Sequence, residues 1–312
     1  MPARSGLDQF TNAVRKFQPK QILFHYLHFA MQFESIMYAC SQDIFIHCHG
    51  YDVTWDLRKH EKPDITFFDS SYTTAVVRMS KRAVLIANSQ YTKQQLLNIG
   101  VSGDRVVVKH LGVPISPRPQ RRPHRDSIRI LYLGRLIDCK GPDLTINAFE
   151  LACDRGLEGE LVMAGDGEMR VTCELMRKRS RYENRIHLLG SFDAQKGAEL
   201  RASSDIFAAH NCVGPLSHQV EAFGVSVIEA MADALPVISA RSGGLLETVI
   251  DGVTGILVEP GDVDGQAEAF LSLARDPDRR ETMGEAGWRR AKEHFSIEKE
   301  QHELLQILKC PT

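Results

Sequence analysis

Two glutamates, Glu221 and Glu229, lie eight positions apart in the otherwise apolar stretch EAFGVSVIEAMADALPVIS. Phe223 and Gly224 predict a turn, and VSVIEAMADA predicts a helix that begins near Val225. The first N–H groups of a helix are free and its N-terminus carries a positive dipole, so this turn could bind a phosphate. Glu221 precedes the turn and could contact the group attached to that phosphate. Glu229 lies in an apolar run, where a carboxylate needs partners, and sugar hydroxyls would serve.

Both glutamates also have ordinary structural explanations. Glu221 is equally consistent with an exposed loop acid, and Glu229 with an ion pair to a nearby cation such as Arg241. The segment that follows, RSGGLLETV, contains Gly243 and Gly244, which allow a close approach of the backbone. Taken alone, that segment predicts only a glycine-containing turn.

Two cations follow an earlier predicted strand, in the segment LGRLIDCKG. The strand ends at Gly134, Arg135 comes directly after it, and Lys140 follows five residues later. Two cations at the carboxyl end of a strand suit a diphosphate, because arginine offers a planar fork of donors and lysine a point charge. Taken alone, two surface cations beside a turn would be the more common explanation.

The segment AGDGE, residues 164–168, places Gly165 and a second glycine directly after another predicted strand. Glycines there let the backbone come close to a ligand, although a simple tight turn fits equally well. The segment is not GxGxxG, and the acidic residue expected about twenty positions later is missing. A nicotinamide-dinucleotide site is therefore poorly supported.

Short apolar runs alternate with longer amphipathic stretches along the chain. We predict strands at 21–27, 43–50, 83–89, 105–113, 128–134, 160–167, 185–191, 205–211, 236–240 and 255–260. Helices are predicted after Ser89, a candidate N-cap, and over the charged tail from about Asp276 to Lys309. The alternation predicts an α/β fold with parallel sheets, which bind ligands at the carboxyl ends of their strands. The four segments described above would meet there.

The segment PISPRPQRRPHRD, residues 114–126, is the best candidate for a linker, because it holds four prolines and almost no apolar residue. Its charge could indicate an anionic partner, but a solvated hinge is the simpler explanation. We therefore expect a first domain over 1–113 and a second over 127–295. A C-terminal helix at 296–312 is expected to pack back toward the first domain.

The composition excludes several classes of protein. The chain of 312 residues is 43% hydrophobic and has a net charge of −2, which gives no electrostatic footprint for nucleic acid. No apolar run reaches the roughly 18–20 residues of a membrane span. The seven cysteines are scattered, without CxxC spacing, and the first ten residues lack the apolar region of a signal peptide. We expect reduced thiols and a cytoplasmic location.

Histidines 47 and 49 alternate with Cys48 at the end of a predicted strand. His-Cys-His could suggest a metal ion, but neighbours in a strand point to opposite faces, so Cys48 cannot join both histidines on one ion. We therefore predict no metal site. From the residues alone, a packed and hydrogen-bonded His49 is favoured over a catalytic one.

In this order and spacing, GRLIDCKG, AGDGE, EAFGVSVIEAMADALPVIS, GGLLE and DGVTGILVEPGD resemble the donor half of the retaining glycosyltransferases of family 4. Glu221 and Glu229 match the paired glutamates of that family, E-x7-E. In the first half, HCHGYD (47–52) looks like the family's strand that ends in an active-site histidine, and AVLIANSQYTKQQLLNIGVSGDRVVVKHLGV (83–113) resembles the segment leading to its hinge. The resemblance covers roughly residues 40–300.

The resemblance implies the GT-B fold, in which two Rossmann-like domains face a cleft, and a role for each matching residue. Arg135 and Lys140 would hold the diphosphate of a nucleotide sugar, Glu229 the ribose and Glu221 the transferred sugar. His49 would reach toward the sugar and the acceptor. The remaining donor-binding positions implied by the resemblance are Gly134 and Gly165, the backbone from Gly190 to Phe192 near the base, and the amides of Phe223, Gly224 and Val225 at the distal phosphate.

The implied reaction moves a hexose from a UDP- or GDP-sugar to a hydroxyl group with retention of configuration, and it needs neither a metal nor a cofactor. The acceptor would be a lipid, a saccharide as in polysaccharide biosynthesis, or a small molecule. Such acceptors admit peripheral association with the inner face of a membrane. We expect no nucleic-acid partner.

Two other functions remain open. A nucleotide-sugar epimerase would need acid and base groups around the sugar ring, and E-x7-E with GRxxxxKG favours transfer over that chemistry. A non-catalytic nucleotide-sugar binding subunit is the other alternative. The resemblance implies a shortened first domain, since the family's opening strand and glycine-rich turn have no counterpart before Ile22. The chain would then be a fragment or a protein with a reduced acceptor domain.

Overall fold

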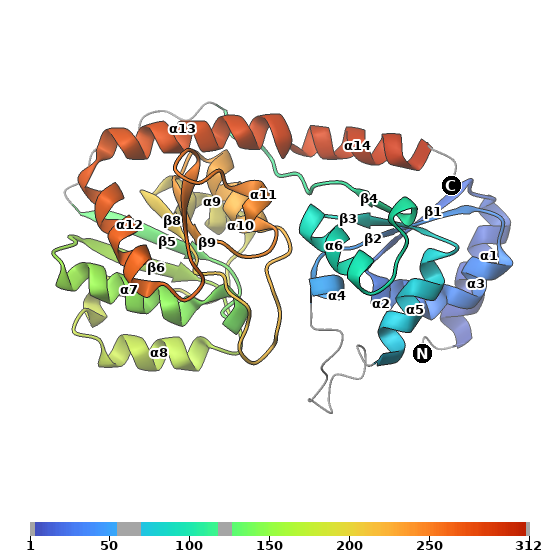
Figure 1. Ribbon diagram of the computed structural model, residues 1–312, viewed down its shortest axis with the longest axis horizontal. Helices are drawn as coiled ribbons and strands as arrows, with labels where there is room; N and C mark the ends of the chain where they lie inside the picture. Colours follow the sequence, from blue (N-terminus) through green and yellow to red (C-terminus); the bar gives the residue numbers. More distant parts are fainter. Residues whose placement is uncertain (1–3, 55–69, 118–126, 310–312) are drawn as a thin grey trace. The chain divides into compact units, whose positions relative to one another are not determined.

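The computed structural model describes residues 4–54, 70–117 and 127–309 (Figure 1). The chain divides into two compact units, one formed by Met1–His110 with Glu300–Thr312 and the other by Leu111–Lys299. Of the predicted linker at 114–126, residues 118–126 lie outside the described residues. Within the described ranges, no helix has both the length and the apolar character needed to cross a bilayer.

The first unit contains a parallel sheet of four strands in the order β1-β2-β3-β4. Its strands are β1 (Gln21–His25), β2 (Asp43–His47), β3 (Val84–Ala87) and β4 (Val106–Val108). Its helices are α1 (Arg4–Phe17), α2 (Leu27–Ala30), η1 (Met31–Phe33), α3 (Glu34–Ala39), α4 (Tyr51–Thr54), α5 (Ser70–Ser80), α6 (Gln90–Asn98) and η2 (Gly103–Arg105). All four predicted strands are confirmed, each at a shorter length.

Local signals set the ends of these elements. The Ser89 hydroxyl accepts a hydrogen bond of 2.9 Å from the Thr92 N–H, which confirms the predicted N-cap of α6. The first strand was predicted to reach Leu27 but ends at His25. Tyr26 takes a positive φ of 67°, and the chain turns directly into α2.

Both faces of the first sheet are covered. On one face, Ile44 and Leu85 of the sheet belong to the larger core cluster, together with Leu27 of α2 and Met37 of α3. The other face, which includes Phe45, Val84 and Ile86, packs against Leu304, Ile307 and Leu308 of α14 (Ile297–Lys309). The C-terminal helix therefore completes the core of the first unit.

The second unit contains a parallel sheet of six strands in the order β10-β9-β8-β5-β6-β7. Its strands are β5 (Ile128–Leu133), β6 (Gly159–Ala164), β7 (Ile186–Leu188), β8 (Ile206–Ala208), β9 (Val237–Ala240) and β10 (Gly255–Val258). Helix α7 (Pro142–Asp154) packs against α12 (Val263–Arg275) and α8 (Arg170–Arg179), while α10 (Val225–Ala232) packs against α13 (Pro277–His294) (Figure 1). The remaining elements are η3 (Asp138–Lys140), η4 (Glu183–Arg185), α9 (Ala194–Ala202) and α11 (Leu245–Thr248).

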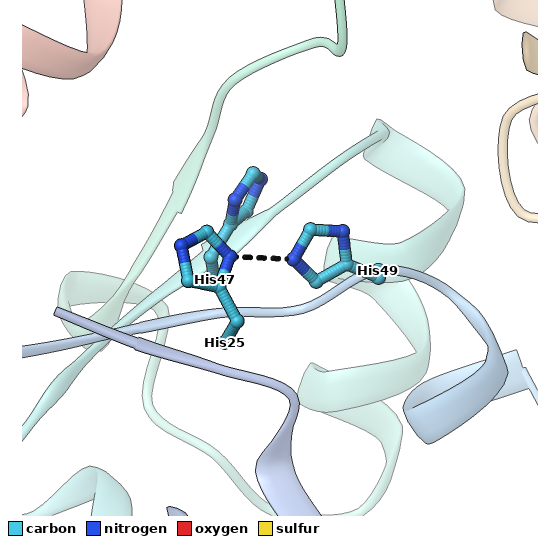
Figure 2. Close-up of side chains that lie close together, drawn as sticks. All are labelled: His25, His47 and His49. Carbon is cyan, nitrogen blue, oxygen red and sulfur yellow. Dashed lines mark hydrogen bonds between the residues drawn. The ribbon is translucent and has the colours of Figure 1, made fainter.

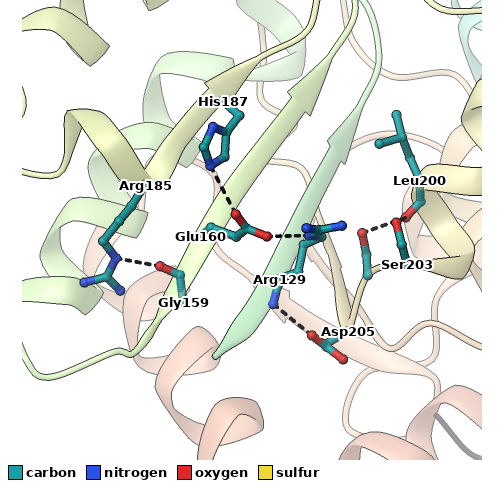
Figure 3. A network of polar contacts seen from close by, with 9 residues as sticks. Arg129, Gly159, Glu160, Arg185, His187, Leu200, Ser203 and Asp205 are labelled. Atoms are coloured by element: carbon teal, nitrogen blue, oxygen red, sulfur yellow. Dashed lines mark hydrogen bonds and ion pairs between the residues drawn. The ribbon is translucent and has the colours of Figure 1, made fainter. Parts of the chain in front are cut away.

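A polar network joins the amino ends of the strands in this sheet (Figure 3). Arg129 on β5 pairs with Glu160 beside it on β6, and Glu160 also contacts His187 on β7 at 3.1 Å. The Asp205 carboxylate accepts a 2.8 Å hydrogen bond from the Arg129 N–H. The network lies at the opposite edge from the carboxyl ends, where we expected the ligand.

The predicted helical tail forms two helices, α13 and α14, because the helix stops at Phe295 and restarts at Ile297. Ala291 and Phe295 are buried, and Trp288 is half-buried, with its indole N–H donating to the Ser116 carbonyl at 3.0 Å. Two parallel sheets covered by helices confirm the predicted α/β class.

Candidate functional site: the carboxyl edge of the second sheet

The turns after β5 and β6 lie side by side. The Gly134 N–H donates to the Ala164 carbonyl at 3.1 Å, and the Gly165 N–H donates to the Gly190 carbonyl at 2.8 Å. Gly165 has a φ of +147°, and a Cβ there would lie 1.8 Å from the Gly134 carbonyl oxygen. Three of the predicted donor-binding glycines therefore meet at one edge, in a packing that excludes any side chain at Gly165.

Lys140 and Glu221 are brought together from two separate segments. The Lys140 ammonium forms an ion pair with the Glu221 carboxylate, and both side chains are largely shielded from solvent, at 17% and 12% exposed. The same carboxylate accepts hydrogen bonds of 3.2 Å from the Asn211 side-chain amide and the Gly224 N–H. Asn211 was not among the predicted site residues, although its place at the end of the predicted strand 205–211 was a usable signal.

Electrostatics keep Glu221 ionised. Burial alone would raise the pKa of its carboxyl group. However, Lys140 acts on the carboxylate through its charge and a hydrogen bond, and the N–H groups of Phe223 and Gly224 donate to it. Together they hold that pKa below its usual value. The negative charge lies directly before helix α10. Gly224 caps that helix with a φ of +84°, and Val225 begins it, half-exposed. A carboxylate thus lies where the sequence predicted a phosphate.

The side chain of Phe223 is buried. The ring packs edge-on against Phe295 with a centroid separation of 5.6 Å. Only the backbone of Phe223 is therefore available to a ligand, as the prediction required. The fourth segment also reaches this turn, since the Gly244 N–H donates to the Glu221 carbonyl at 2.9 Å.

Glu229 pairs with Arg201 and not with Arg241. The Arg201 guanidinium lies 3.1 Å from Glu229 and 2.6 Å from Asp233. Arg241 pairs with Asp251, so the cation named as an alternative partner was wrong. Burial, with the nearby charge of Asp233, raises the pKa of Glu229 despite Arg201. Glu229 remains 36% exposed and accessible to a ligand.

Arg135 is exposed, and no side chain among the described residues pairs with its guanidinium. Its carbonyl accepts a 2.8 Å hydrogen bond from the Tyr132 hydroxyl, which anchors the backbone beneath it. Phe192 is also partly exposed, at 38%.

Asp138, two residues before Lys140, connects η3 to the loop at 216–217. Its carboxylate accepts hydrogen bonds from the N–H groups of Leu216 at 2.9 Å and Ser217 at 2.7 Å. Asp138 was not among the predicted site residues.

In the first unit, His49 lies in a cluster of three histidines with His25 and His47 (Figure 2). His25 Nδ1 and His49 Nε2 share a hydrogen bond of 2.8 Å. The pKa of His47 is lowered to about 2 by burial and by the charge of Lys109. The pKa of His49 is lowered to about 4 by burial and by the neighbouring His25 and Lys109. His25 was not among the predicted site residues, because the first strand was predicted to continue to Leu27 and only the structure ends it at His25.

The loop that carries His49 is held by Asp52, which is fully buried. Its two carboxylate oxygens accept hydrogen bonds from the His49 N–H at 2.9 Å and the Leu27 N–H at 2.8 Å. Cys48 is buried and makes a long contact of 3.9 Å to the Ile46 carbonyl, outside the histidine cluster. The strand alternation therefore predicted the separation of Cys48 from the histidines correctly.

The fold is that of known glycosyltransferases. A crystal structure of HepE from Anabaena in complex with UDP-glucose superposes with a TM-score of 0.77 at 21% identity, over 97% of this chain and 81% of that one. Sucrose-phosphate synthase from Thermosynechococcus elongatus also has a TM-score of 0.77, at 21% identity, over 97% of this chain and 76% of that one. These similarities confirm the GT-B fold class.

Among curated proteins, a GDP-mannose-dependent alpha-(1-6)-phosphatidylinositol monomannoside mannosyltransferase of Mycolicibacterium smegmatis is 28% identical over 258 residues. The match covers 80% of this chain and 65% of that protein, so the chain spans slightly less than two thirds of this relative's length. A model of the family "Glycosyl transferases group 1" matches residues 117–290, more than half of the chain. The protein therefore belongs to the glycosyl transferases group 1 family.

Proposed function

We propose that this protein is a retaining glycosyltransferase, which moves a hexose from a nucleoside diphosphate sugar to a hydroxyl acceptor. One observation carries the proposal: Lys140 and Glu221 meet at the start of helix α10, on the sheet edge that also presents Arg135. Two further findings support it. The mycobacterial relative is named for its use of GDP-mannose, and HepE was crystallised with UDP-glucose.

The donor would replace an interaction already present in the protein. The Glu221 carboxylate accepts from the Gly224 N–H and pairs with Lys140, so it occupies the place of an anionic ligand. A diphosphate carries more charge, and we propose that it takes over Lys140 and the α10 amides, with the distal phosphate near Phe223, Gly224 and Val225. Glu221 is then released to accept hydrogen bonds from the hydroxyls of the transferred sugar.

The remaining donor contacts follow from the positions of the other residues. Glu229, partly exposed on α10, would accept from the ribose hydroxyls. The backbone from Gly190 to Phe192 would meet the base beside the turn at Gly165. Because Arg135 has no competing partner among the described side chains, its guanidinium is free to bind the diphosphate.

The chemical step breaks the bond between the anomeric carbon and the diphosphate oxygen, whose electron pair leaves with the nucleoside diphosphate. The acceptor oxygen forms the new bond on the same face of the anomeric carbon, and its proton passes to the departing diphosphate oxygen. Arg135, Lys140 and the N-terminus of α10 would stabilise the negative charge that develops on the leaving group, without a metal ion.

The acceptor class rests on the relatives alone. The mycobacterial protein is named for a phosphatidylinositol mannoside, a lipid acceptor. We propose a lipid or saccharide acceptor for this chain also, with peripheral association at the cytoplasmic face of a membrane. Titration of the purified protein with acceptor-containing vesicles and with water-soluble glycosides distinguishes the two acceptors.

The proposal is tested by incubating the protein with UDP-glucose and GDP-mannose, with a chelator present. Slow release of free sugar, detected by NMR with the anomer seen first matching the donor, supports a retaining transferase. Arg135→Ala should lower kcat/KM about 10²–10³-fold, as expected for a lost charge-stabilising group. Arg179→Ala, an exposed arginine on α8, is the matched control and should behave as wild type.

Three outcomes would contradict the proposal. An isomerised donor would assign an epimerase, and tight donor binding without turnover would assign a binding subunit. Equal rates in Arg135→Ala and Arg179→Ala would remove the diphosphate site from the carboxyl edge of the second sheet.

A further inference from the structure

Three imidazoles from separate segments gather in the first unit (Figure 2). His25 is the last residue of β1 and His47 the last of β2, and the parallel register of these strands places them side by side. His49 follows two residues after His47. One ring nitrogen from each histidine can be chosen so that all three lie within 4.8 Å of one another.

His47 is the unusual member of this cluster. Its side chain is only 2% exposed, and neither ring nitrogen has a hydrogen-bond partner among the described residues. A buried polar group without a partner is unfavourable, because it has lost its hydrogen bonds to water. The rings of His47 and His49 lie close together, tilted by 48° with centroids 4.4 Å apart. A bound ligand at this position would satisfy one of them.

The chemistry of the cluster selects the ligand. All three donors are imidazole nitrogens, with no carboxylate in the cluster, so hard cations that prefer oxygen are disfavoured. Imidazole is the usual ligand of zinc and its neighbours in the transition series. Cys48 is directed elsewhere, to the Ile46 carbonyl, and adds no thiolate.

Lys109 is the feature that opposes a cation here. Its ammonium is fully buried and its charge acts on both His47 and His49. However, Lys109 forms an ion pair with Glu300 of helix α14, so its positive charge is compensated within the same unit. At His49, the charge of Glu300 acts in the opposite sense to that of Lys109 and offsets part of it.

We propose that His25, His47 and His49 form a binding site for a transition-metal dication of the zinc class. Three nitrogens at Zn–N distances of about 2.0–2.1 Å lie roughly 3.4 Å apart around a tetrahedral ion, so small rotations of the rings complete the site. The ion replaces the hydrogen bond between His25 and His49. His25 is exposed, which provides an entry path and leaves the fourth position for water.

The site is tested on the full chain, freed of any affinity tag and stripped with a chelator. Isothermal titration with ZnCl₂ should show one equivalent bound. Affinity should fall by more than about tenfold in His25→Ala, a change at an exposed position that the fold tolerates. His47→Gln, checked by circular dichroism, should lose binding similarly. His302→Ala, an exposed histidine of α14, is the matched control and should bind as wild type.

Cobalt provides the second readout, because its absorption reports the ligands. Co²⁺ bound by three imidazoles and water gives visible bands typical of a four-coordinate site, without thiolate charge transfer in the near ultraviolet. No stoichiometric binding would overturn the proposal, and so would equal affinity in wild type and His25→Ala. A thiolate band would assign the metal to cysteines and overturn it also. None of these readouts depends on glycosyl transfer.

Discussion

The paired carboxylates, Glu221 and Glu229, differ in their surroundings more than their spacing suggests. Glu221 is held by a lysine and by backbone N–H groups that lower the pKa of its carboxyl group. Glu229 is partly exposed and has a raised pKa, because burial and Asp233 outweigh Arg201. One acid therefore lies within the predicted phosphate seat, while the other lies beside it on the helix. We therefore expect substitutions of the two glutamates to change different kinetic constants.

Glu229→Ala should weaken nucleotide binding, with KM for the donor rising and kcat nearly unchanged. Glu221→Ala should mainly lower kcat, because we propose that this carboxylate contacts the transferred sugar as the bond breaks. Steady-state kinetics with donor hydrolysis as the readout measures both. Asp251→Ala, which removes an acid paired with Arg241, is the control. Intact turnover in Glu221→Ala would show that the role of this residue is misassigned.

His210 should make stability depend on pH. It is fully buried after β8, donating from Nδ1 to Gln266 and accepting from the Gly261 N–H, both at 2.8 Å. Burial lowers its pKa below the ordinary 6.5 despite the hydrogen bond that it donates to Gln266. The unfolded chain therefore takes up a proton as the pH falls below 6.5 while the folded protein stays neutral, so stability present above that pH is progressively lost.

Urea unfolding at about pH 7.5 and about pH 5.5 measures this loss. His210→Gln cannot titrate, so its stability should fall less between the two pH values, by up to about 1.4 kcal/mol. His302→Gln on the exposed part of α14 is the control and should keep the full wild-type difference. Identical pH dependence in His210→Gln and wild type would show that His210 does not contribute.

At the scale of elements, the turns after the strands are built by close backbone contacts. Gly141 links η3 to α7 at a φ of +55°, and a Cβ there would lie 2.1 Å from the His210 carbonyl oxygen. Lys140 directly precedes it. The position of the lysine therefore depends on a glycine that permits two loops, from β5 and β8, to touch.

Gly141→Ala should destabilise the protein and weaken donor binding through displacement of Lys140. Gly156→Ala is a matched control, because Gly156 also has a positive φ, of +92°, but nothing lies within 4 Å of its Cβ position. The control should cost about 1 kcal/mol from backbone strain alone, and Gly141→Ala at least about 1 kcal/mol more. Equal losses in urea unfolding would rule out the steric explanation.

At the scale of the whole molecule, the chain returns to its first unit through α14. Leu304 of that helix packs against Phe45, Val84 and Ile86 of the first sheet, whereas Leu305 next to it is 56% exposed. Residues of the first sheet and of the last helix thus share one core. The first unit should depend on the last helix for stability.

Leu304→Ala should lower the free energy of unfolding by about 1–2 kcal/mol, because it removes partly buried apolar surface from that core. Leu305→Ala makes the same chemical change at an exposed position and should stay within about 0.5 kcal/mol of wild type. Denaturant unfolding of both variants measures the difference. Similar effects at the two positions would mean that α14 does not pack as described.

The sequence by itself determined the order of the elements and the candidate residues. Periodicity located every strand in the described residues, and Ser89 marked a helix start, because these signals depend on neighbours a few positions away. Glycines, cations and acids after the strands indicated the carboxyl edge of the second sheet as the site. The strand ends were less accurate, as at Tyr26, because a turn is set by packing as well as by composition.

Only the tertiary structure decided which of these residues are partners. Glu229 pairs with Arg201 across 28 positions, and His25 joins His49 across 24. Spacing along the chain carries no signal for such pairs, because contacts between strands and loops depend on how the sheet is ordered. The structure therefore assigned Lys140 to Glu221 and gathered three histidines at one sheet edge, where alternation along β2 had led us to predict no metal site.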